Sequence, residues 1–230
     1  MGAEEAGPAM DERTAADVDP GRGYVADEPA YALIRERVGP GSTVLDIGCG
    51  HGNVGAYLAE AGAVVDGIEP DAARAAAAEA KLHQVCVAPL AGAIGSRLLR
   101  PAYDVVTMID VVEHVASPVE LLRQAATFLA PEGRLFLFVP NSAHWSARKK
   151  IARGDWSYAD WGLFDRTHLR FFDRTTAAAL GPAAGLVETD RWDTSPGTTM
   201  INRYGMRWWP ELFAFHFLFE LRLPAAPGVR

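Results

Sequence analysis

Residues 44 to 53 read Val44-Leu45-Asp46-Ile47-Gly48-Cys49-Gly50-His51-Gly52-Asn53. The first four have the apolar character of a buried strand, and the residues after them have the pattern of a helix. The three glycines in between let the backbone turn tightly and approach a ligand, because they carry no side chain to obstruct it. A helix N-terminus behind such a turn favours negatively polarised groups. The segment therefore predicts a nucleotide-type binding loop in a Rossmann-like domain.

Two acids beside this loop narrow the choice of ligand. A carboxylate at Asp46 would repel the pyrophosphate of NAD or FAD but would attract an ammonium group. Asn53 stands where the dinucleotide pattern G-x-G-x-x-G has its last glycine. The next predicted strand ends at Glu69, which can accept hydrogen bonds from both hydroxyls of a ribose. The ligand predicted here carries both an amine and a ribose.

Strands and helices alternate along most of the chain. Apolar runs predict strands at 42–47, 63–68, 84–88, 103–109, 134–139 and 186–192, with a last buried strand in 212–223. Helical periodicity predicts helices at 28–38, 54–60, 72–82, 118–129 and 173–184, the third capped by Asp71. Strands that alternate with helices at these lengths predict a parallel sheet with helices on both faces. The expected fold class is therefore α/β, as a doubly wound Rossmann-like domain.

The domain is expected to span residues 25–230. Residues 1–24 lack apolar periodicity and are expected to form a flexible tail that orders over a ligand as a lid. Residues 141–172 interrupt the alternation and are rich in Trp, Arg and Lys, so we expect an insertion that faces the substrate. Its tryptophans Trp145, Trp156 and Trp161 are equally consistent with a pocket wall and with a dimer interface.

Composition excludes several classes of protein. The 230 residues carry 22 Lys and Arg against 29 Asp and Glu, a net charge of −7, which disfavours nucleic acid as a partner. The two cysteines indicate a reducing compartment, and the acidic start lacks the pattern of a signal peptide. The most apolar late segment is too short to cross a membrane. We expect a cytoplasmic monomer or homodimer.

These motifs resemble the class I S-adenosylmethionine (SAM)-dependent methyltransferases, in particular the small-molecule branch with type 11 and type 23 methyltransferase domains. The motifs that carry the resemblance are VLDIGCGHG, the acid Glu69, YDVVTMIDVVEHVASP, LAPEGRLFLFVPN and FDRTHLRFF. The resemblance implies a seven-stranded sheet of order 3-2-1-4-5-7-6 whose last strand, within 213–223, is antiparallel. SAM would be the cofactor, S-adenosylhomocysteine (SAH) the product, and no metal is implied.

The resemblance also assigns cofactor contacts. The methionine part of SAM would lie against Asp46, Gly48 and Gly50, with Cys49 packing beside it. Glu69 would bind the ribose, Ile68 and Pro70 would flank the adenine, and the segment beneath the sulfonium would be Ile109, Asp110 and Val111. One departure is clear: the third strand runs into Val87-Ala88-Pro89-Leu90 and lacks the acid that usually contacts the adenine amino group.

For the acceptor site the sequence offers two kinds of residue, histidine bases and arginines. A neutral histidine could take the proton of a hydroxyl acceptor, and the candidates are His168 and His114. The alternatives to a catalytic role are helix capping by Glu113 and His114, and a structural hydrogen bond to a backbone carbonyl for His168. An anionic acceptor would need no base and would be oriented by Arg166 and Arg170, although the basic run around them is more often a solvated helix face. Tyr31 and Asn141 complete the candidate substrate-binding residues.

The predicted reaction is methyl transfer to an oxygen of a small molecule, for example an anionic natural-product intermediate. The sequence motif Asn-Pro-Pro-Tyr of many base and amide N-methyltransferases is absent at 109–113, which places N- and C-methylation second. An NAD-dependent oxidoreductase and a non-catalytic SAM-binding protein stay open as alternatives. A macromolecular methyltransferase would need a recognition module for which the chain has little room.

Overall fold

The computed structural model describes residues 28–195 and 200–225. Seven strands form one sheet: β1 (Thr43–Ile47), β2 (Val64–Ile68), β3 (Gln84–Cys86), β4 (Tyr103–Ile109), β5 (Leu129–Pro140), β6 (Val187–Thr194) and β7 (His216–Arg222). The helices up to β5 are α2 (Pro29–Arg37), α3 (Asn53–Ala59), α4 (Ala72–Glu79), α5 (Leu90–Ala93), the short 3-10 helix η1 (Val112–His114) and α6 (Pro118–Ala126). Those after β5 are α7 (Trp145–Ala152), α8 (Arg174–Ala178), α9 (Leu180–Ala183), α10 (Met200–Trp208) and α11 (Pro210–Phe213).

The strand order is β3-β2-β1-β4-β5-β7-β6, which confirms the predicted topology. The first five strands are parallel, and β7 runs antiparallel to both of its neighbours, β5 and β6. The ladder of β1 and β2 pairs Asp46 with Gly67 and Ile47 with Ile68. The carboxyl ends of the two strands that carry the predicted cofactor residues therefore lie side by side.

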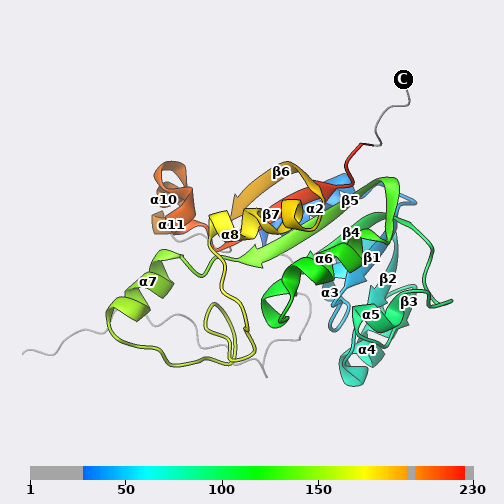
Figure 1. Ribbon diagram of the computed structural model, residues 1–230, viewed down its shortest axis with the longest axis horizontal. Coiled ribbons are helices and arrows are strands. Elements are labelled where there is room, and N and C mark those ends of the chain that lie inside the picture. The colour runs from blue at the N-terminus through cyan, green and yellow to red at the C-terminus, as the bar shows by residue number, and fades with distance from the viewer. Residues whose placement is uncertain (1–27, 196–199, 226–230) are drawn as a thin grey trace, which may run out of the picture.

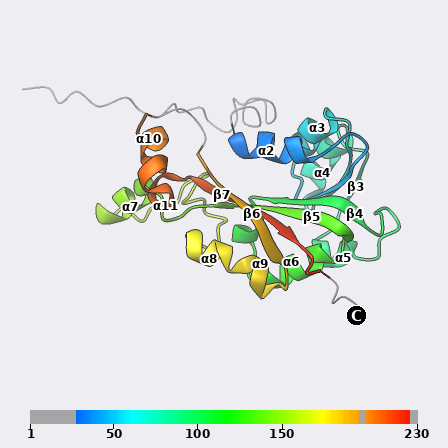
Figure 2. The same ribbon diagram turned by 90° about the horizontal axis from the view of Figure 1, so that it is seen from above.

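Helices cover both faces of the sheet, as predicted. Figure 2 shows α2, α3 and α4 on one face and α5, α6, α8 and α9 on the other. Each interface has its own apolar cluster, one that includes Ile34, Leu58 and Val65 and a larger one that includes Met108, Leu122 and Leu137. Because β4 and β5 contribute to both clusters, they are buried on both faces, which is typical of central strands in a doubly wound domain.

Local signals place several helix starts. The Asp71 side chain accepts hydrogen bonds of 2.9 Å from the backbone N–H groups of Ala73 and Arg74, which confirms it as the cap of α4. Asp173 and Thr176 form a capping box at the start of α8. Pro118 begins α6, a position at which proline loses no helical hydrogen bond.

Three predicted boundaries were wrong. The helix predicted at 118–129 ends at Ala126, because Leu129 already pairs with Tyr103 in the sheet. Pro131 and Gly133 therefore lie inside β5, where the register with β4 is irregular, and do not end a helix. The helix predicted at 173–184 is divided into α8 and α9, since Pro182 has no N–H to donate to Ala178.

The third correction concerns the apolar run 212–223. Its first residues belong to α11, which has Pro210 in its first turn, and β7 begins only at His216. The run is continuous in hydropathy although α11 has no buried residue, and the core begins only with Ala214 and the residues of β7. The antiparallel direction that the resemblance implied for this strand is confirmed.

The insertion 141–172 lies beyond the carboxyl end of β5. It contains α7 and a loop held by the bridges Asn141–Phe172 and Ala159–Asp165. Figures 1 and 2 both place α7 beside α10 and α11 at this end of the sheet. The tail predicted as a lid, residues 1–24, lies outside the described residues. None of the helices described for this chain has the length and apolar character needed to cross a bilayer.

Candidate functional site

The glycine loop joins β1 to α3 at the carboxyl end of the sheet. Gly48 has a φ of +73°, a left-handed conformation, and a Cβ built on it would lie 2.7 Å from a methyl carbon of Val111. Any other residue would therefore push the loops after β1 and β4 apart. Gly50 is also left-handed, with φ +53°, but nothing lies within 4 Å of its hypothetical Cβ. The loop is thus closed against Val111 on one side and open at Gly50.

The two acids predicted beside the loop both lie against it. Asp46 is 3% exposed and accepts a hydrogen bond of 2.7 Å from the Thr107 hydroxyl. Burial raises the pKa of Asp46 to about 6, the Thr107 hydrogen bond opposes this, and the charge of Glu69 adds to it. Glu69 is 5% exposed and accepts the backbone N–H groups of Gly50 and Asp71, each at 2.9 Å. The loop is therefore flanked by two buried carboxyls at adjacent strand ends.

The other predicted cofactor residues border the same loop. Cys49 is a free, buried thiol whose pKa is raised above its usual range by burial and by the charges of Asp46 and Glu69, so it is not a nucleophile. Pro70 follows Glu69 at the surface. At the third strand, Val87 is exposed and carries no acid, as the sequence indicated.

The segment after β4 is conformationally unusual. Asp110 has a φ of +51° and is the one non-glycine residue with positive φ among those described. Its N–H donates to the Phe138 carbonyl at 3.2 Å, which holds it to β5. Burial raises the pKa of Asp110. The neighbouring His216 opposes this rise, and the neighbouring Glu28 adds to it. Backbone strain of this kind is concentrated at functional sites.

Two residues that the sequence did not single out for the site lie beside Asp110. His216 begins β7, and its Nε2 is 3.9 Å from an Asp110 carboxyl oxygen while its Nδ1 is 3.5 Å from Glu28. The ring lies 4.3 Å from the Phe138 ring, measured between centroids. Glu28 and His216 are separated by most of the chain, so no local pattern could pair them. The sequence could indicate a special role for Glu28 and His216 only because each is a polar residue within an apolar stretch.

The two histidines predicted as bases come together. His114 ends η1, His168 lies in the insertion, and their ring centroids are 4.8 Å apart. The insertion is held in place because the N–H groups of Leu169 and Arg170 donate to the Glu113 carbonyl at 2.8 and 3.0 Å. Burial lowers the pKa of His168, and the neighbouring His114 lowers it further. His168 is therefore a neutral imidazole at neutral pH.

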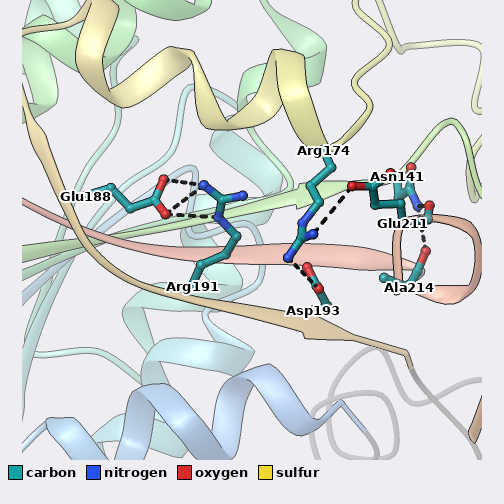
Figure 3. Close-up of polar contacts among 7 residues, drawn as sticks. All are labelled: Asn141, Arg174, Glu188, Arg191, Asp193, Glu211 and Ala214. Atoms are coloured by element: carbon teal, nitrogen blue, oxygen red, sulfur yellow. Dashed lines mark hydrogen bonds and ion pairs between the residues drawn. The ribbon is translucent and has the colours of Figure 1, made fainter. Parts of the chain in front are cut away.

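The four predicted substrate residues are each engaged by the protein itself. Asn141 is fully buried, and its amide donates to the carbonyls of Glu211 and Ala214 at 2.9 and 2.7 Å (Figure 3). Tyr31 is 1% exposed and packs against Phe138. Arg166 pairs with Asp160 at 2.5 Å, and Arg170 donates to the Ala116 carbonyl. These contacts hold Asn141 and Tyr31 in the core and give each arginine one partner within the protein.

The arrangement fits the ligand that the sequence indicated. Glu69 and the open side of Gly50 provide the acceptor and the space that a ribose needs, and Asp46 provides a negative charge below the loop. The left-handed turn at Asp110 brings Val111 against Gly48, so the loops after β1 and β4 meet. His114 comes shortly after this meeting point, its N–H donates to the Val111 carbonyl at 3.1 Å, and its ring contacts that of His168 from the insertion.

Comparison with known sequences agrees with this geometry. The sequence model of a family described as a methyltransferase domain matches residues 22–189. A ubiquinone biosynthesis O-methyltransferase of Aeromonas salmonicida is 29% identical over 156 residues, 65% of each chain. One from Pseudomonas paraeruginosa is 36% identical over 115 residues, 47% of this chain and 49% of that protein. The chain thus matches less than two thirds of the length of these relatives.

Solved structures share the fold at low identity. The magnesium protoporphyrin IX methyltransferase of Synechocystis PCC 6803 with bound SAH gives a TM-score of 0.60 at 19% identity, covering 87% of this chain and 82% of that one. The 1,6-didemethyltoxoflavin N1-methyltransferase of Burkholderia thailandensis gives 0.59 at 18% identity, with 91% and 82% covered. At these identities the likeness supports the architecture alone.

Proposed function

Since this chain belongs to the methyltransferase domain family, we propose that it transfers a methyl group from SAM to an oxygen atom of a small-molecule acceptor. The observation that carries this proposal is the contact between the rings of His114, which follows the turn at Asp110, and His168, whose pKa is lowered by burial. A hydroxyl acceptor needs its proton removed as the new bond forms, and an unprotonated imidazole suits that task near neutral pH. The names of the O-methyltransferase relatives support the same choice.

The residues of this chain would divide the work of binding and positioning. Glu69 would hold the ribose hydroxyls, and Asp46 would favour the ammonium end of the donor. Asp46, Gly48, Cys49 and Gly50 form the loop side of the site, while Ile109, Asp110 and Val111 form its floor. SAM, when bound, would supply an electrophilic methyl group to the acceptor oxygen and would leave as SAH. The proton of the acceptor passes to an unprotonated ring nitrogen of His168.

A neutral hydroxyl acceptor fits better than an anionic one. Arg166 is paired with Asp160 at the surface, and Arg170 donates to the Ala116 carbonyl, so a carboxylate or phosphonate would compete with these contacts for each guanidinium. An anionic natural-product intermediate would have to displace these contacts. Alignment of the acceptor oxygen with the methyl group, rather than charge pairing with an arginine, would then supply most of the rate enhancement.

The acceptor element can be tested with matched nucleophiles. The purified protein is incubated with SAM and with a phenol, an aniline and a benzoate of the same ring, and SAH formation is measured. We expect turnover of the phenol, and a rate that falls as the pH drops below the lowered pKa of His168, because a protonated imidazole cannot accept the acceptor proton. His168→Gln should lower the rate by roughly 10²- to 10⁴-fold.

His83→Gln is the matched control, because His83 lies outside the site and bonds to Asp66. It should retain the wild-type rate. Turnover of the aniline alone would overturn the oxygen assignment and leave N-methylation as the activity. An equal loss of rate in His83→Gln and His168→Gln would remove the special role of His168.

A further inference from the structure

The carboxyl group of Glu113 is buried beside the proposed acceptor site without hydrogen-bond partners. It is 1% exposed, and neither of its oxygens has a hydrogen-bond partner. Its backbone carbonyl is occupied by Leu169 and Arg170, so the residue is fixed in place while its side chain is unsatisfied. Buried carboxyl oxygens are almost always bonded, since the alternative costs several kcal/mol per group. The position therefore calls for a cationic or proton-donating partner.

The imidazole of His114 faces Glu113 through its Nε2 nitrogen. Its Nδ1 is 3.0 Å from the Thr167 hydroxyl oxygen and 3.3 Å from the Thr167 carbonyl oxygen. The hydroxyl already donates its hydrogen to Asp165 at 2.6 Å, so both Thr167 oxygens accept, and Nδ1 must carry the proton. The other nitrogen, Nε2, is left to face Glu113 and lies 3.9 Å from one of its carboxyl oxygens.

His168 completes the group in the same way. One of its ring nitrogens makes a hydrogen bond to the backbone of Leu163. Among the residues described, Glu113, His114 and His168 form the group whose ligand atoms all lie within 4.8 Å of one another. Histidines that bind metals usually donate their second nitrogen to a carbonyl or carboxylate. Both histidines here have that arrangement.

From this geometry we infer that Glu113, His114 and His168 bind one divalent transition-metal ion of the zinc type. The sequence did not predict this site, because its ligands come from η1 and from a separate loop of the insertion. Two imidazoles and one carboxylate are a ligand set of catalytic zinc sites, which keep further positions open. Ligands about 2.1 Å from one tetrahedral ion lie about 3.4 Å apart, so shifts of roughly 1 Å close the site.

The metal would deepen the proposed function, and its chemical role rests on that function. An acceptor hydroxyl that enters an open position would lose its proton to solvent through coordination, because a bound divalent cation lowers the pKa of an oxygen ligand. With one ring nitrogen of each histidine coordinated, His168 would hold the metal, and coordination of the acceptor oxygen would replace His168 as the means of removing the acceptor proton. Asp165 would then act as a positioning residue, since it holds Thr167 and through it the ring of His114.

The nitrogen ligands distinguish this ion from magnesium. Mg²⁺ prefers six oxygen ligands, whereas Zn²⁺ takes imidazole readily. The full-length protein is therefore stripped with EDTA, dialysed against ZnCl₂ or MgCl₂, and its bound metal counted by mass spectrometry. Co²⁺ is added in parallel, because its visible absorption reports nitrogen coordination without any enzyme assay. We expect one Zn²⁺ per chain and a Co²⁺ spectrum typical of low coordination number.

Glu113→Gln and His168→Gln should each weaken Zn²⁺ binding by at least about tenfold, the loss that changes around a metal site cause even outside the ligand set. His83→Gln and Glu120→Gln are matched controls, and they should bind Zn²⁺ like the wild type. SAH affinity is measured calorimetrically on every variant and shows whether each one is folded. Wild-type Zn²⁺ binding in Glu113→Gln and His168→Gln, or a preference for Mg²⁺, would overturn the site.

The two proposals fail separately. If SAH binds and Zn²⁺ does not, the metal site is wrong and the histidine base of the proposed function stands. If Zn²⁺ binds at one per chain and no hydroxyl acceptor is methylated, the metal site stands and the oxygen specificity falls. The calorimetric and metal-counting measurements therefore decide different statements about the same group of residues.

Discussion

Asp46 shows at the scale of one residue how function opposes stability. Its carboxyl is buried, and burial raises its pKa from 3.8 to about 6. The folded protein therefore holds the proton at pH values where the unfolded chain has already lost it. The stability associated with this proton is present below pH 3.8 and is lost as the pH rises through about 6. Above that value the buried charge costs about 3 kcal/mol, at 1.36 kcal/mol for each pKa unit.

Asp46→Asn should therefore stabilise the protein while it weakens the site. The amide oxygen can still accept the Thr107 hydroxyl, but no charge has to be buried. We expect the free energy of unfolding at about pH 7.5 to rise by up to roughly 3 kcal/mol, and the gain to shrink near pH 5. Urea unfolding at the two pH values measures this difference. A variant less stable than the wild type at the higher pH would contradict the account.

The positions of Asp46, Gly48 and Glu69 at one sheet edge could be predicted because their signals are local. The glycine at 48 and the acids at 46 and 69 sit at the ends of strongly apolar strands, so pattern alone places them at one edge of the sheet. Glu28 and His216 gave no such signal, since only the packing of α2 against β5 and β7 brings them to Asp110. The neighbourhood of Glu113 and His168 was hidden for the same reason.

At the scale of elements, the side chain of Asn141 joins the end of β5 to α11 and to the segment before β7. It follows β5, its amide group donates to carbonyls of α11 and of the segment before β7, and its amide oxygen accepts the Ala143 N–H at 3.0 Å. Asn141→Ala would leave these buried backbone groups unpaired, at about 1–3 kcal/mol for each unsatisfied group. We expect the variant to lose roughly 3 kcal/mol of unfolding free energy with little change in the KM for the acceptor.

This prediction separates the structural role of Asn141 from the substrate-binding role that the sequence suggested. Denaturant unfolding and steady-state kinetics are measured on Asn141→Ala and on Gln124→Ala, whose partner Glu120 is exposed. The control should keep wild-type stability within about 0.5 kcal/mol. If Asn141→Ala raises KM strongly and leaves stability unchanged, Asn141 contacts the acceptor after all.

Element boundaries were predicted where capping residues are unambiguous and missed where tertiary pairing overrides propensity. Asp71 and Pro118 begin helices as their residue types require. Leu129 has the helical pattern of the preceding residues, but its pairing with Tyr103 makes it a strand residue. A local sequence pattern cannot reveal that the strand partner of Leu129 is Tyr103, because the two residues are far apart along the chain. The same limit explains why 212–223 was predicted as one strand.

At the scale of the whole molecule, one sheet connects β1 and β2, which carry Asp46 and precede Glu69, to the last strand β7. The family match ends at residue 189, within β6, yet β7 is inserted between β5 and β6 and completes the core. Figure 2 shows that the helices of both faces share this one sheet. No layer can detach without exposing an apolar cluster, so the described domain should unfold in a single cooperative transition.

Binding at the edge formed by β1 and β2 should then stabilise strands that never touch the ligand. At SAH concentrations of about 100 times Kd, the expected gain is about 2.7 kcal/mol, which corresponds to a rise in Tm of roughly 5–10 °C for a domain of this size. Scanning calorimetry should show one peak that moves as a unit, and hydrogen exchange in β7 should slow in parallel. Glu69→Ala removes the carboxylate proposed to hold the ribose and should abolish most of the shift, whereas Asp104→Asn, at the opposite end of β4, should retain it. Two calorimetric peaks, of which SAH moves only one, would mean that the sheet does not couple the site to β6 and β7.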